Sequence, residues 1–253
     1  MLSEINKHER DHYISFVEEG HIYTLLSPET DEVKHPISVT TLISKYYPHF
    51  DADKCIEKMM NSRNWPNNKY YGMTPDEIKS QWDETRDTSA KSGTAMHANI
   101  ESYLNSLPVC DESDEFKMFL KFWGDFQAKY SFKPYRLEWC VYDELFRNGK
   151  GLCGSIDCVL SDGKGNIMIF DWKRSKEIKV ENSYEKMNPP FDDMDNTNLS
   201  HYKLQLNVYR HILIHKYKLN VVFMMLVILH PNQTGYHTIK INPIDLTSVW
   251  HTL

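Results

Sequence analysis

Two short apolar runs near the middle of the chain carry acidic residues where a buried carboxylate would be unfavourable. The first run contains Asp157, and the second contains Asp171, followed two residues later by Lys173. The segment 161–166 between them is rich in Gly, Asp and Asn, which is typical of a tight turn. We therefore expect a hairpin, within 151–175, that brings two carboxylates and one amine together. One lysine does not neutralise two buried acids, so the pattern predicts a bound divalent cation.

The alternation of side chains along these strands predicts which residues share a face. In the second run, the acid and the lysine lie on the same side as the isoleucines. In the first run, we expect Ile156 and Leu160 to share the face opposite the carboxylate. A third strand, just before the hairpin, would carry Leu137 and Trp139 on one face and Glu138 on the other. Glu138 is then expected to join the carboxylate face; the alternative is a solvated strand residue.

Helical patterns precede the hairpin. Thr74-Pro75-Asp76-Glu77 is a capping-box start, and the helix after it is expected to run to about Ala90. Helical periodicity continues through 93–104 and carries His97. Aromatic residues at three- and four-residue spacing over 113–130 indicate a further helix whose aromatic stripe faces the core. A single histidine on such a helix is more often an ordinary packed or surface residue than a metal ligand, so His97 alone is a weak signal.

Another long helix follows the hairpin. We expect Asn198 or Ser200 to cap it and the helix to reach about Tyr217. On it, Gln205 and Tyr209 lie four residues apart and therefore share a face. Their structural alternative is ordinary helix packing.

Composition limits the class of protein. The chain has 253 residues, 41% hydrophobic and 25% charged, which suits one large or two small globular domains. No run approaches the roughly 18 apolar residues that span a bilayer, and the N-terminus has no secretory or transit pattern, so we expect an intracellular protein without membrane contacts. The net charge of −6 argues against indiscriminate nucleic-acid binding. The five cysteines form no Cys-x-x-Cys pair, so we expect small buried hydrophobic residues, not disulfides or a zinc ribbon.

Five short motifs follow one another in a recognisable order. They are Gly93-x-x-x-His97, Glu138, Gly154-x-x-Asp157, Asp171-x-Lys173 and Gln205-x-x-x-Tyr209. Each is common by itself, but the ordered set resembles the RecB-type branch of the PD-(D/E)XK nuclease superfamily. Within that branch it is similar to the mitochondrial genome maintenance exonuclease and its phage and large-virus relatives. The resemblance covers roughly 37–241.

The resemblance implies a fold and a domain arrangement. The fold would be α/β, with a restriction-endonuclease-like core in which helices flank a mixed central sheet. The chain 1–253 would form a single nuclease domain, with an N-terminal hairpin and helical elaboration over 1–90 and the catalytic core over 91–243. If the chain is viral, as some of these relatives are, it would act inside the host cell.

The resemblance also implies a metal site. Mg²⁺ or Mn²⁺ would be bound by His97, Asp157, Asp171 and the carbonyl oxygen of Trp172, and one imidazole among oxygen ligands favours manganese. Lys173 would position the attacking water or neutralise developing charge. Other residues with expected catalytic roles are Glu138, which would hold a metal-bound water or a second cation, and Gln205 and Tyr209, which would support Lys173 or contact a phosphate. Iron–sulfur members of the branch need a late cysteine triplet, and no cysteine follows Cys158, so we expect no such cluster.

The residues after Lys173 are expected to bind substrate. Arg174, Ser175 and Lys176 follow it directly, and Arg136 is expected to border the same face. The alternative is a solvated basic run. The polar loop 176–198 would close over a threaded strand as a lid, or it would be a simple insertion.

These observations predict a metal-dependent DNA exonuclease that acts on single-stranded or free-ended DNA in replication, repair or recombination. One alternative is an RNA or DNA endonuclease of the cap-snatching type, which also combines a histidine, two acids and a lysine. Another is a non-catalytic DNA-binding protein that keeps the nuclease fold. The intact acidic pair with its lysine argues against the last alternative.

Overall fold

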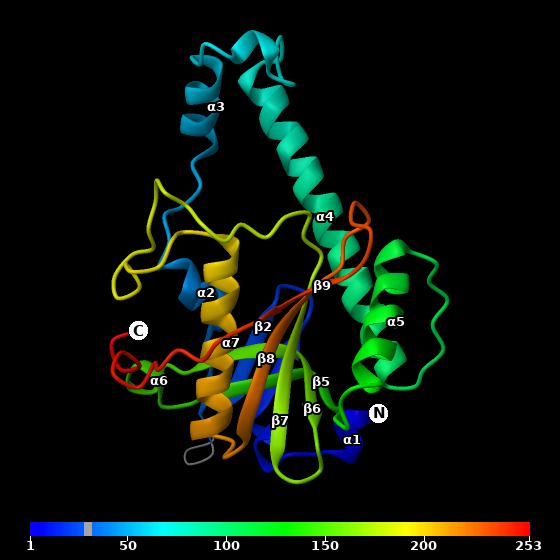
Figure 1. Cartoon of the computed structure of the whole chain (residues 1–253). Coiled ribbons are helices and arrows are strands. Elements are labelled where there is room, and N and C mark those ends of the chain that lie inside the picture. Colours follow the sequence, from blue (N-terminus) through cyan, green and yellow to red (C-terminus); the bar gives the residue numbers. More distant parts are fainter. Residues whose placement is uncertain (28–31) are drawn as a thin grey trace.

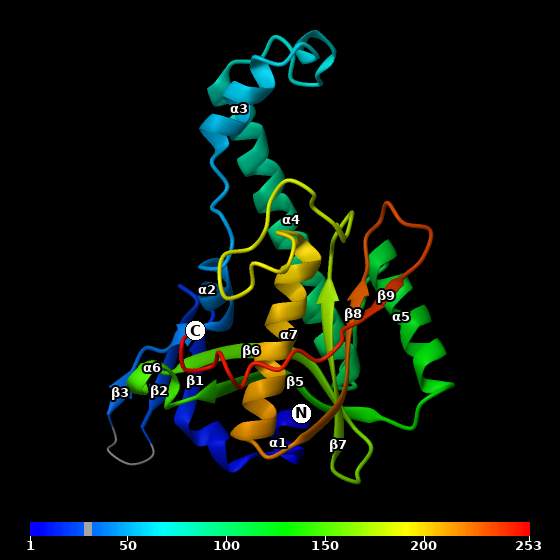
Figure 2. The ribbon, with the colours of Figure 1, turned by 60° about the vertical axis from the view of Figure 1, so that its left-hand side comes forward.

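The computed structural model describes residues 1–27 and 32–253 and has the expected α/β architecture, a mixed sheet flanked by helices (Figures 1 and 2). The main sheet has six strands in the order β4-β6-β7-β8-β9, with β5 paired to β6. Its strands are β4 (Ile37–Ser38), β5 (Lys133–Asp143), β6 (Leu152–Ser161), β7 (Asn166–Lys173), β8 (Asn220–Ile228) and β9 (His237–Lys240). The pairs β4–β6 and β7–β8 are parallel, and the other pairs are antiparallel.

A smaller sheet of three strands lies at the N-terminus. It contains β1 (Ile14–Val17), β2 (Ile22–Leu26) and β3 (Val33–Lys34). The N-terminal hairpin expected within 1–90 corresponds to β2 and β3, whereas β1 was not predicted. The turn expected between β2 and β3 falls largely on residues 28–31, outside the described residues. Tyr23 and Leu25 bury their side chains in the main core, so this sheet is part of the same folded unit.

Helices cover both faces of the main sheet. The helices are α1 (Leu2–Ile5), α2 (Val39–Ser44), α3 (Ala52–Met60), α4 (Pro75–Leu104), α5 (Asp114–Gln127), α6 (Phe146–Gly149) and α7 (Asn198–His215), with single 3₁₀ turns at Glu9–Tyr13 and Trp65–Asn67. Helices α2 and α7 pack on one face in one hydrophobic cluster, whereas α5 and the second half of α4 pack on the other. Of the helices in the described ranges, none combines the length and apolarity that a bilayer crossing requires.

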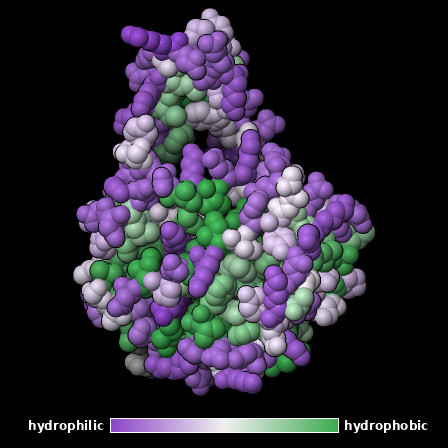
Figure 3. All heavy atoms as spheres, in the orientation of Figure 1, coloured by the Kyte–Doolittle hydropathy of each residue, from purple (hydrophilic) through white to green (hydrophobic). Residues whose placement is uncertain are grey.

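Helix α4 is longer than the sequence predicted, a single helix of 30 residues. Its predicted start is confirmed, because the hydroxyl of Thr74 accepts a hydrogen bond from Glu77 N–H and the Glu77 carboxylate accepts one from Thr74 N–H. The helix crosses the expected internal boundary at 90/91 without interruption. Its first half and α3 project from the body around a small cluster of their own, with Ile56 and Ile78 at its centre (Figures 1 and 3).

The predicted alternation is confirmed in β7. Ile167 and Ile169 belong to the cluster on the α7 side. Met168, Phe170 and Trp172 belong to the cluster on the α5 side, where they meet the aromatic stripe of α5. The aromatic residues of 113–130 are therefore core residues, as the sequence indicated.

The predicted alternation is wrong in β5 and β6. Leu137 pairs with Cys158 and both lie in the α5-side cluster, but Trp139 pairs with Ile156 and both lie in the α7-side cluster. Leu160 likewise lies on the α5 side, away from Ile156. In both strands, therefore, the side chains change from one face of the sheet to the other at the same place, between the Leu137–Cys158 pair and the Trp139–Ile156 pair. The backbone at Glu138 has φ +40°, which breaks the regular pleat and explains the reversal.

The reversal coincides with a gap beside β6. On that edge, β4 pairs with residues 152–153 and β7 pairs with 158–161, so within the described residues no strand pairs with 154–157 there. The gap lies under α7, because a Cβ at Gly154 would meet the ring of Tyr209. Asp157 therefore lies at the gap in the strand pairing, where its side chain can contact residues of neighbouring helices such as His97 of α4.

The long polar loop before α7 is partly fixed to the body. Met187 and Phe191 are buried in the main cluster, and the N–H of Asn188 donates to the carbonyl of Tyr46 at 2.7 Å. Thr197, not Asn198 or Ser200, caps α7, and the helix ends at His215, short of the expected Tyr217. The second half of the loop is therefore docked against the segment after α2, and the first half is hydrogen-bonded to residues 195–198.

Leu246, Trp250 and Leu253, near the C-terminus, are buried in the main cluster. One expectation about the cysteines needs correction. All five cysteines are free, as expected, yet Cys55 and Cys110 are exposed and do not behave as buried hydrophobic residues.

Candidate metal centre

Three acidic or imidazole side chains from three elements converge at the gap in the sheet. His97 of α4, Glu138 of β5 and Asp157 of β6 each offer a ligand atom, and these atoms lie within 4.8 Å of one another. Nδ1 of His97 is 3.4 Å from Oε1 of Glu138 and 3.6 Å from Oδ2 of Asp157. Nε2 of the same ring is 3.0 Å from the carbonyl oxygen of Trp172. Three of the four predicted metal ligands are thus neighbours, with Asp157 and also Glu138 on the Nδ1 side of the His97 ring and the Trp172 carbonyl on its Nε2 side.

The irregular backbone of β5 and β6 positions these carboxylates. A positive φ is uncommon for a residue with a side chain, and such strained positions are often found at functional sites. Here it occurs at Glu138, whose carboxylate accepts a hydrogen bond of 3.0 Å from the hydroxyl of Ser155. Asp157 accepts a hydrogen bond of 2.8 Å from the backbone N–H of Trp172. Both acids are therefore fixed by the adjacent strands.

The fourth predicted ligand, Asp171, lies beside Lys173 as expected. Its Oδ2 is 2.7 Å from Nζ of Lys173, and the two side chains are only 3% and 18% exposed. Apart from this ion pair with Lys173, Oδ2 has no hydrogen-bond partner among the described residues. The ring of Tyr202 lies 4.6 Å below the same ammonium group. Asp171 is thus a buried carboxylate whose hydrogen-bonding capacity is only partly used.

The charges at this site raise several pKa values. Burial raises the pKa of Asp171 to about 6, because the attraction of Lys173 offsets it only in part and Asp157 adds repulsion. Burial likewise raises the pKa of Asp157. For His97, burial favours the neutral ring, but Asp157 and Glu138 together outweigh it and raise the pKa to about 9. The excess of carboxylates therefore draws positive charge to the site.

This donor set fits a divalent cation. With the imidazole neutral, three carboxylates and one ammonium group leave a formal charge of −2, which a divalent cation would neutralise. The buried Oδ2 of Asp171, which among the described residues is paired with Lys173 alone, and the clustered ligand atoms of His97 and Asp157 are consistent with that interpretation. The thiols of the chain contribute no ligand atom to this cluster of described residues.

The predicted Gln205–Tyr209 pair lies on α7 above the divided strand. Tyr209 is buried, and a Cβ at Gly154 would come within 2.8 Å of its hydroxyl, so only glycine allows the ring to lie against β6. Burial raises the pKa of Tyr209 well above its ordinary range, although a hydrogen bond with Gln205 opposes this effect. The aromatic residue that contacts Lys173 is Tyr202, which the sequence analysis missed. Its spacing of three residues before Gln205 was the available signal.

The residues expected to bind substrate have different surroundings. Nε of Arg174 lies 2.6 Å from Oε1 of Glu115 on α5, and both side chains are largely buried. The hydroxyl of Ser175 donates to the carbonyl of Glu177 at 2.8 Å, and Lys176 is exposed. Among Arg174, Ser175 and Lys176, it is therefore Lys176 whose basic side chain is exposed and can bind a ligand.

Arg136 does not border this site, contrary to the prediction. Its side chain is buried, 2.5 Å from Asp11 and 3.0 Å from the carbonyl of Asn6. The reversal of faces in β5 explains the error. Because the alternation breaks at Glu138, the side on which Arg136 lies does not follow from the side of the residues at or after Glu138. Arg136 instead fastens the N-terminal segment to the sheet.

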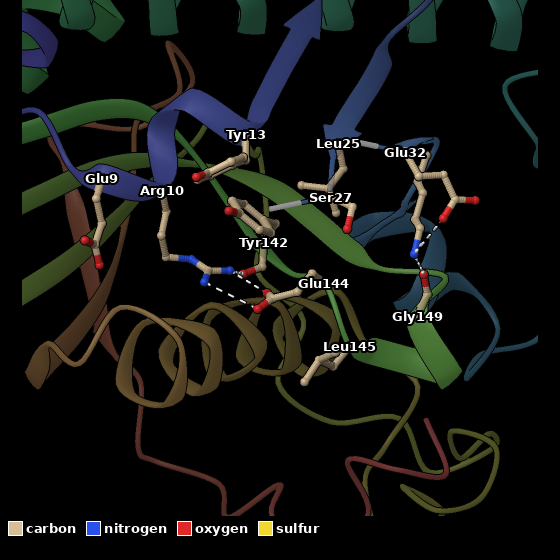
Figure 4. A pocket seen from close by; sticks show the side chains of 11 residues that line it. Glu9, Arg10, Tyr13, Leu25, Ser27, Glu32, Tyr142, Glu144, Leu145 and Gly149 are labelled. Atoms are coloured by element: carbon tan, nitrogen blue, oxygen red, sulfur yellow. Dashed lines mark hydrogen bonds and ion pairs between the residues drawn. The ribbon is translucent and has the colours of Figure 1, made fainter. Parts of the chain in front are cut away.

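A second cavity, of about 450 Å³, lies on another part of the molecule between the N-terminal segment and the end of β5 (Figure 4). Its guanidinium, from Arg10, lies 2.5 Å from Glu144 and also donates to the carbonyl of Tyr142. Its ammonium, from Lys34, donates to the carbonyl of Gly149 at 3.1 Å. The cavity shares no lining residue with the metal centre, and its cations are already paired with groups of the protein.

Comparison with known proteins adds little to the geometry. No family model and no curated protein matches the chain. One similar solved structure is described as "Crystal structure of SSO0001", with 15% sequence identity and a TM-score of 0.37 over 85% of this chain and 70% of that one. A likeness of this size carries no argument about family or activity.

Proposed function

We propose that this chain is a metal-dependent nuclease of the PD-(D/E)XK type that hydrolyses phosphodiester bonds in DNA. The observation that carries the proposal is the convergence of His97, Glu138 and Asp157 at the point where the sheet divides, near enough to the Asp171–Lys173 pair for their charges to interact. The three converging groups come from three separate elements, and the strand reversal beside Asp157 includes a strained backbone conformation at Glu138. Their unmet negative charge supports a cation at the site.

The proposed roles follow from the surroundings of each group. His97, Asp157, Asp171 and the carbonyl of Trp172 would hold Mg²⁺ or Mn²⁺. When bound, such a cation supplies a Lewis acid for the phosphate and acidifies a water. Lys173, held between Asp171 and the ring of Tyr202, would stabilise negative charge that develops on the phosphate. Glu138, fixed by Ser155, would orient a water on the side of His97.

The resemblance noted in the sequence favours an exonuclease acting on free DNA ends. The elements around the site are compatible with that form of the proposal. The projection formed by α3 and the first half of α4 rises from the helix that carries His97, and the first half of the 176–198 loop follows Lys173 directly. A strand approaching the site would pass between them. The role would be in DNA replication, repair or recombination, and an iron–sulfur cluster is no part of the proposal.

The test is a digestion of end-labelled DNA and RNA, single- and double-stranded, linear and circular, with Mn²⁺, with Mg²⁺ and with a chelator. We expect linear DNA to be cleaved only with metal, and closed circles to resist. The Asp171→Asn variant is the matched control for a contaminating nuclease. Rapid cleavage of circles would replace the exonuclease with an endonuclease, preference for RNA would favour the cap-snatching type, and no cleavage of any substrate would leave only a binding protein.

A further inference from the structure

A groove of about 620 Å³ opens beside the metal centre, and the space inside it has no ligand in the proposal above. His97 and Glu138 form part of its floor. One wall is the α4 helix at Gly93, and the opposite wall is the β1–β2 hairpin with Phe16 and His21. A ligand in this groove would therefore lie next to the reacting phosphate, between a helix and an aromatic surface.

The hairpin wall is an ordered set of aromatic rings. The ring centroids of Phe16 and His21 are 5.0 Å apart, and those of Phe16 and Tyr23 are 4.5 Å apart. His21 has φ +52°, a conformation that side chains disfavour, and follows Gly20 with φ +81°. This turn is closed by a hydrogen bond from His21 N–H to the carbonyl of Glu18. The backbone thus holds an exposed imidazole against Phe16, where it faces the groove.

The helix wall is bare at Gly93. Glycine in a helix interior is unfavourable, and it persists where a side chain cannot fit. At Gly93, however, a Cβ would meet no atom of the described residues within 4 Å. No packing against the protein explains this glycine. Its effect is to leave the groove open at a point facing the aromatic wall.

The charges of the groove select the class of ligand. Glu18, Glu101 and Glu138 line it, and of the described residues in its lining none is Lys or Arg. With three carboxylates against the imidazoles of His21 and His97, the groove disfavours a phosphate, whereas a flat, uncharged ring would stack on the aromatic wall. A nucleobase has this chemistry.

We infer that this groove seats one nucleobase of the substrate, that of the nucleotide adjoining the cleaved phosphate, stacked against Phe16 and His21 and passing over Gly93. The inference rests on the proposed nuclease function and deepens it, because it gives the hairpin a positioning role. Stacking accepts any base, so the groove would tolerate all four and reject a nucleotide that lacks one.

The first test uses two glycines in helices. Gly93→Ala should raise the melting temperature by about 2–4 °C, because alanine is the better helix former, and raise KM for DNA about 5- to 100-fold, the range seen when a base loses its stacking surface. Gly124→Ala is the matched control, since Gly124 lies in α5 and also meets nothing within 4 Å. It should gain the same stability and leave KM unchanged. An unchanged KM in Gly93→Ala would overturn the inference.

The second test removes the base instead of the wall. Oligonucleotides with one abasic position, placed at each of the first three positions from either end, should be cleaved by the wild type about 5- to 100-fold less efficiently at one position. In the Phe16→Ala/His21→Ala variant that defect should largely disappear. If the variant does not fold, the Gly93→Ala comparison with abasic substrates answers the same question. Equal abasic defects in wild type and variants would refute the inference.

A binding measurement distinguishes failure of this inference from failure of the nuclease proposal. With 2-aminopurine at the sensitive position, quenching on binding to the Asp171→Asn variant reports stacking without cleavage. Quenching that is lost on Phe16→Ala/His21→Ala supports the groove whether or not the wild type cleaves DNA. Quenching of equal size in both proteins, or none in either, contradicts it.

Discussion

Two buried aspartates of the same sheet are compensated very differently. Asp143, at the end of β5, is 2.9 Å from Nζ of Lys216 and accepts hydrogen bonds from Trp250 Nε1 and from a backbone N–H. Asp171, near the end of β7, has the ammonium of Lys173 2.7 Å from its Oδ2, but no other donor among the described residues reaches that oxygen. Both carboxylates are nearly inaccessible to solvent. A satisfied buried acid is part of the fold, whereas an unsatisfied one has remaining affinity for a ligand.

The surroundings of Asp143 also show why composition alone does not make a metal site. His211, His215 and His251 line a cavity that Asp143 also lines. The ring of His211 stacks on Trp250, with centroids 3.9 Å apart, and so packs the C-terminal segment onto α7. Within the described residues, only the cluster around His97 brings ligand atoms of three such side chains within 4.8 Å of one another. Convergence, and not the presence of histidine and aspartate, separates the two regions.

The sharpest way to break this comparison is to replace each aspartate by asparagine. Asp171→Asn should lower cleavage on the order of 10³-fold or more, because it removes a proposed ligand charge from the site. The fold should persist, since Asp157 still faces Lys173. Circular dichroism and metal titration by calorimetry would accompany the cleavage assay. Cleavage at the wild-type rate would remove Asp171 from the site.

Asp143→Asn is the counterpart. It should leave cleavage unchanged but lower the free energy of unfolding by about 3 kcal/mol or more, because Lys216 loses its buried partner. Chemical denaturation measures this difference. If both variants lose stability alike and cleave alike, the distinction between the two carboxylates is wrong.

A smaller effect separates the ligand from the charge beside it. Lys173→Ala should reduce turnover by about 10²- to 10³-fold, the usual loss for one transition-state charge contact, with metal affinity nearly unchanged. The reason is that Lys173 contacts Asp171 and Tyr202 and is not itself a ligand. A collapse of metal affinity in calorimetry would instead make Lys173 a structural support of the site.

Much of this site was predictable because its patterns are local. The hairpin turn, the shared face of Asp171 and Lys173 and the helical periodicity around His97 each follow from residues a few positions apart. The reversal at Glu138 was not predictable, because it depends on the backbone of two strands acting together. The pairing of Arg174 was missed for a similar reason, since its partner comes from α5, far away in the sequence.

The pKa of Asp171 gives a pH test of the comparison in metal-free protein. Its pKa is raised to about 6 in the folded state, above the unfolded value, so the folded state binds the proton more tightly. Stability from this group therefore increases as pH falls from about 7 to 4. Relative to Asp171→Asn, the wild type should gain at most about 3 kcal/mol over that range. Denaturation with a chelator measures it; a constant difference would mean that Asp171 is already compensated.

The smallest expected effect concerns the basic residues after Lys173. Lys176 is exposed, and Arg174 is paired with Glu115, so only the former should contribute to the dependence of DNA binding on salt. For single-stranded DNA on the Asp171→Asn background, three or four phosphate contacts give a slope near −2 to −3 in log K against log salt, at about −0.7 per contact. Lys176→Ala should make that slope about 0.7 shallower. Arg174→Ala should leave the slope unchanged and lower stability, since it leaves the largely buried carboxylate of Glu115 without its ion-pair partner. A shallower slope in Arg174→Ala would show that this arginine leaves Glu115 to meet the DNA, and the basic run would then act as one phosphate-binding segment.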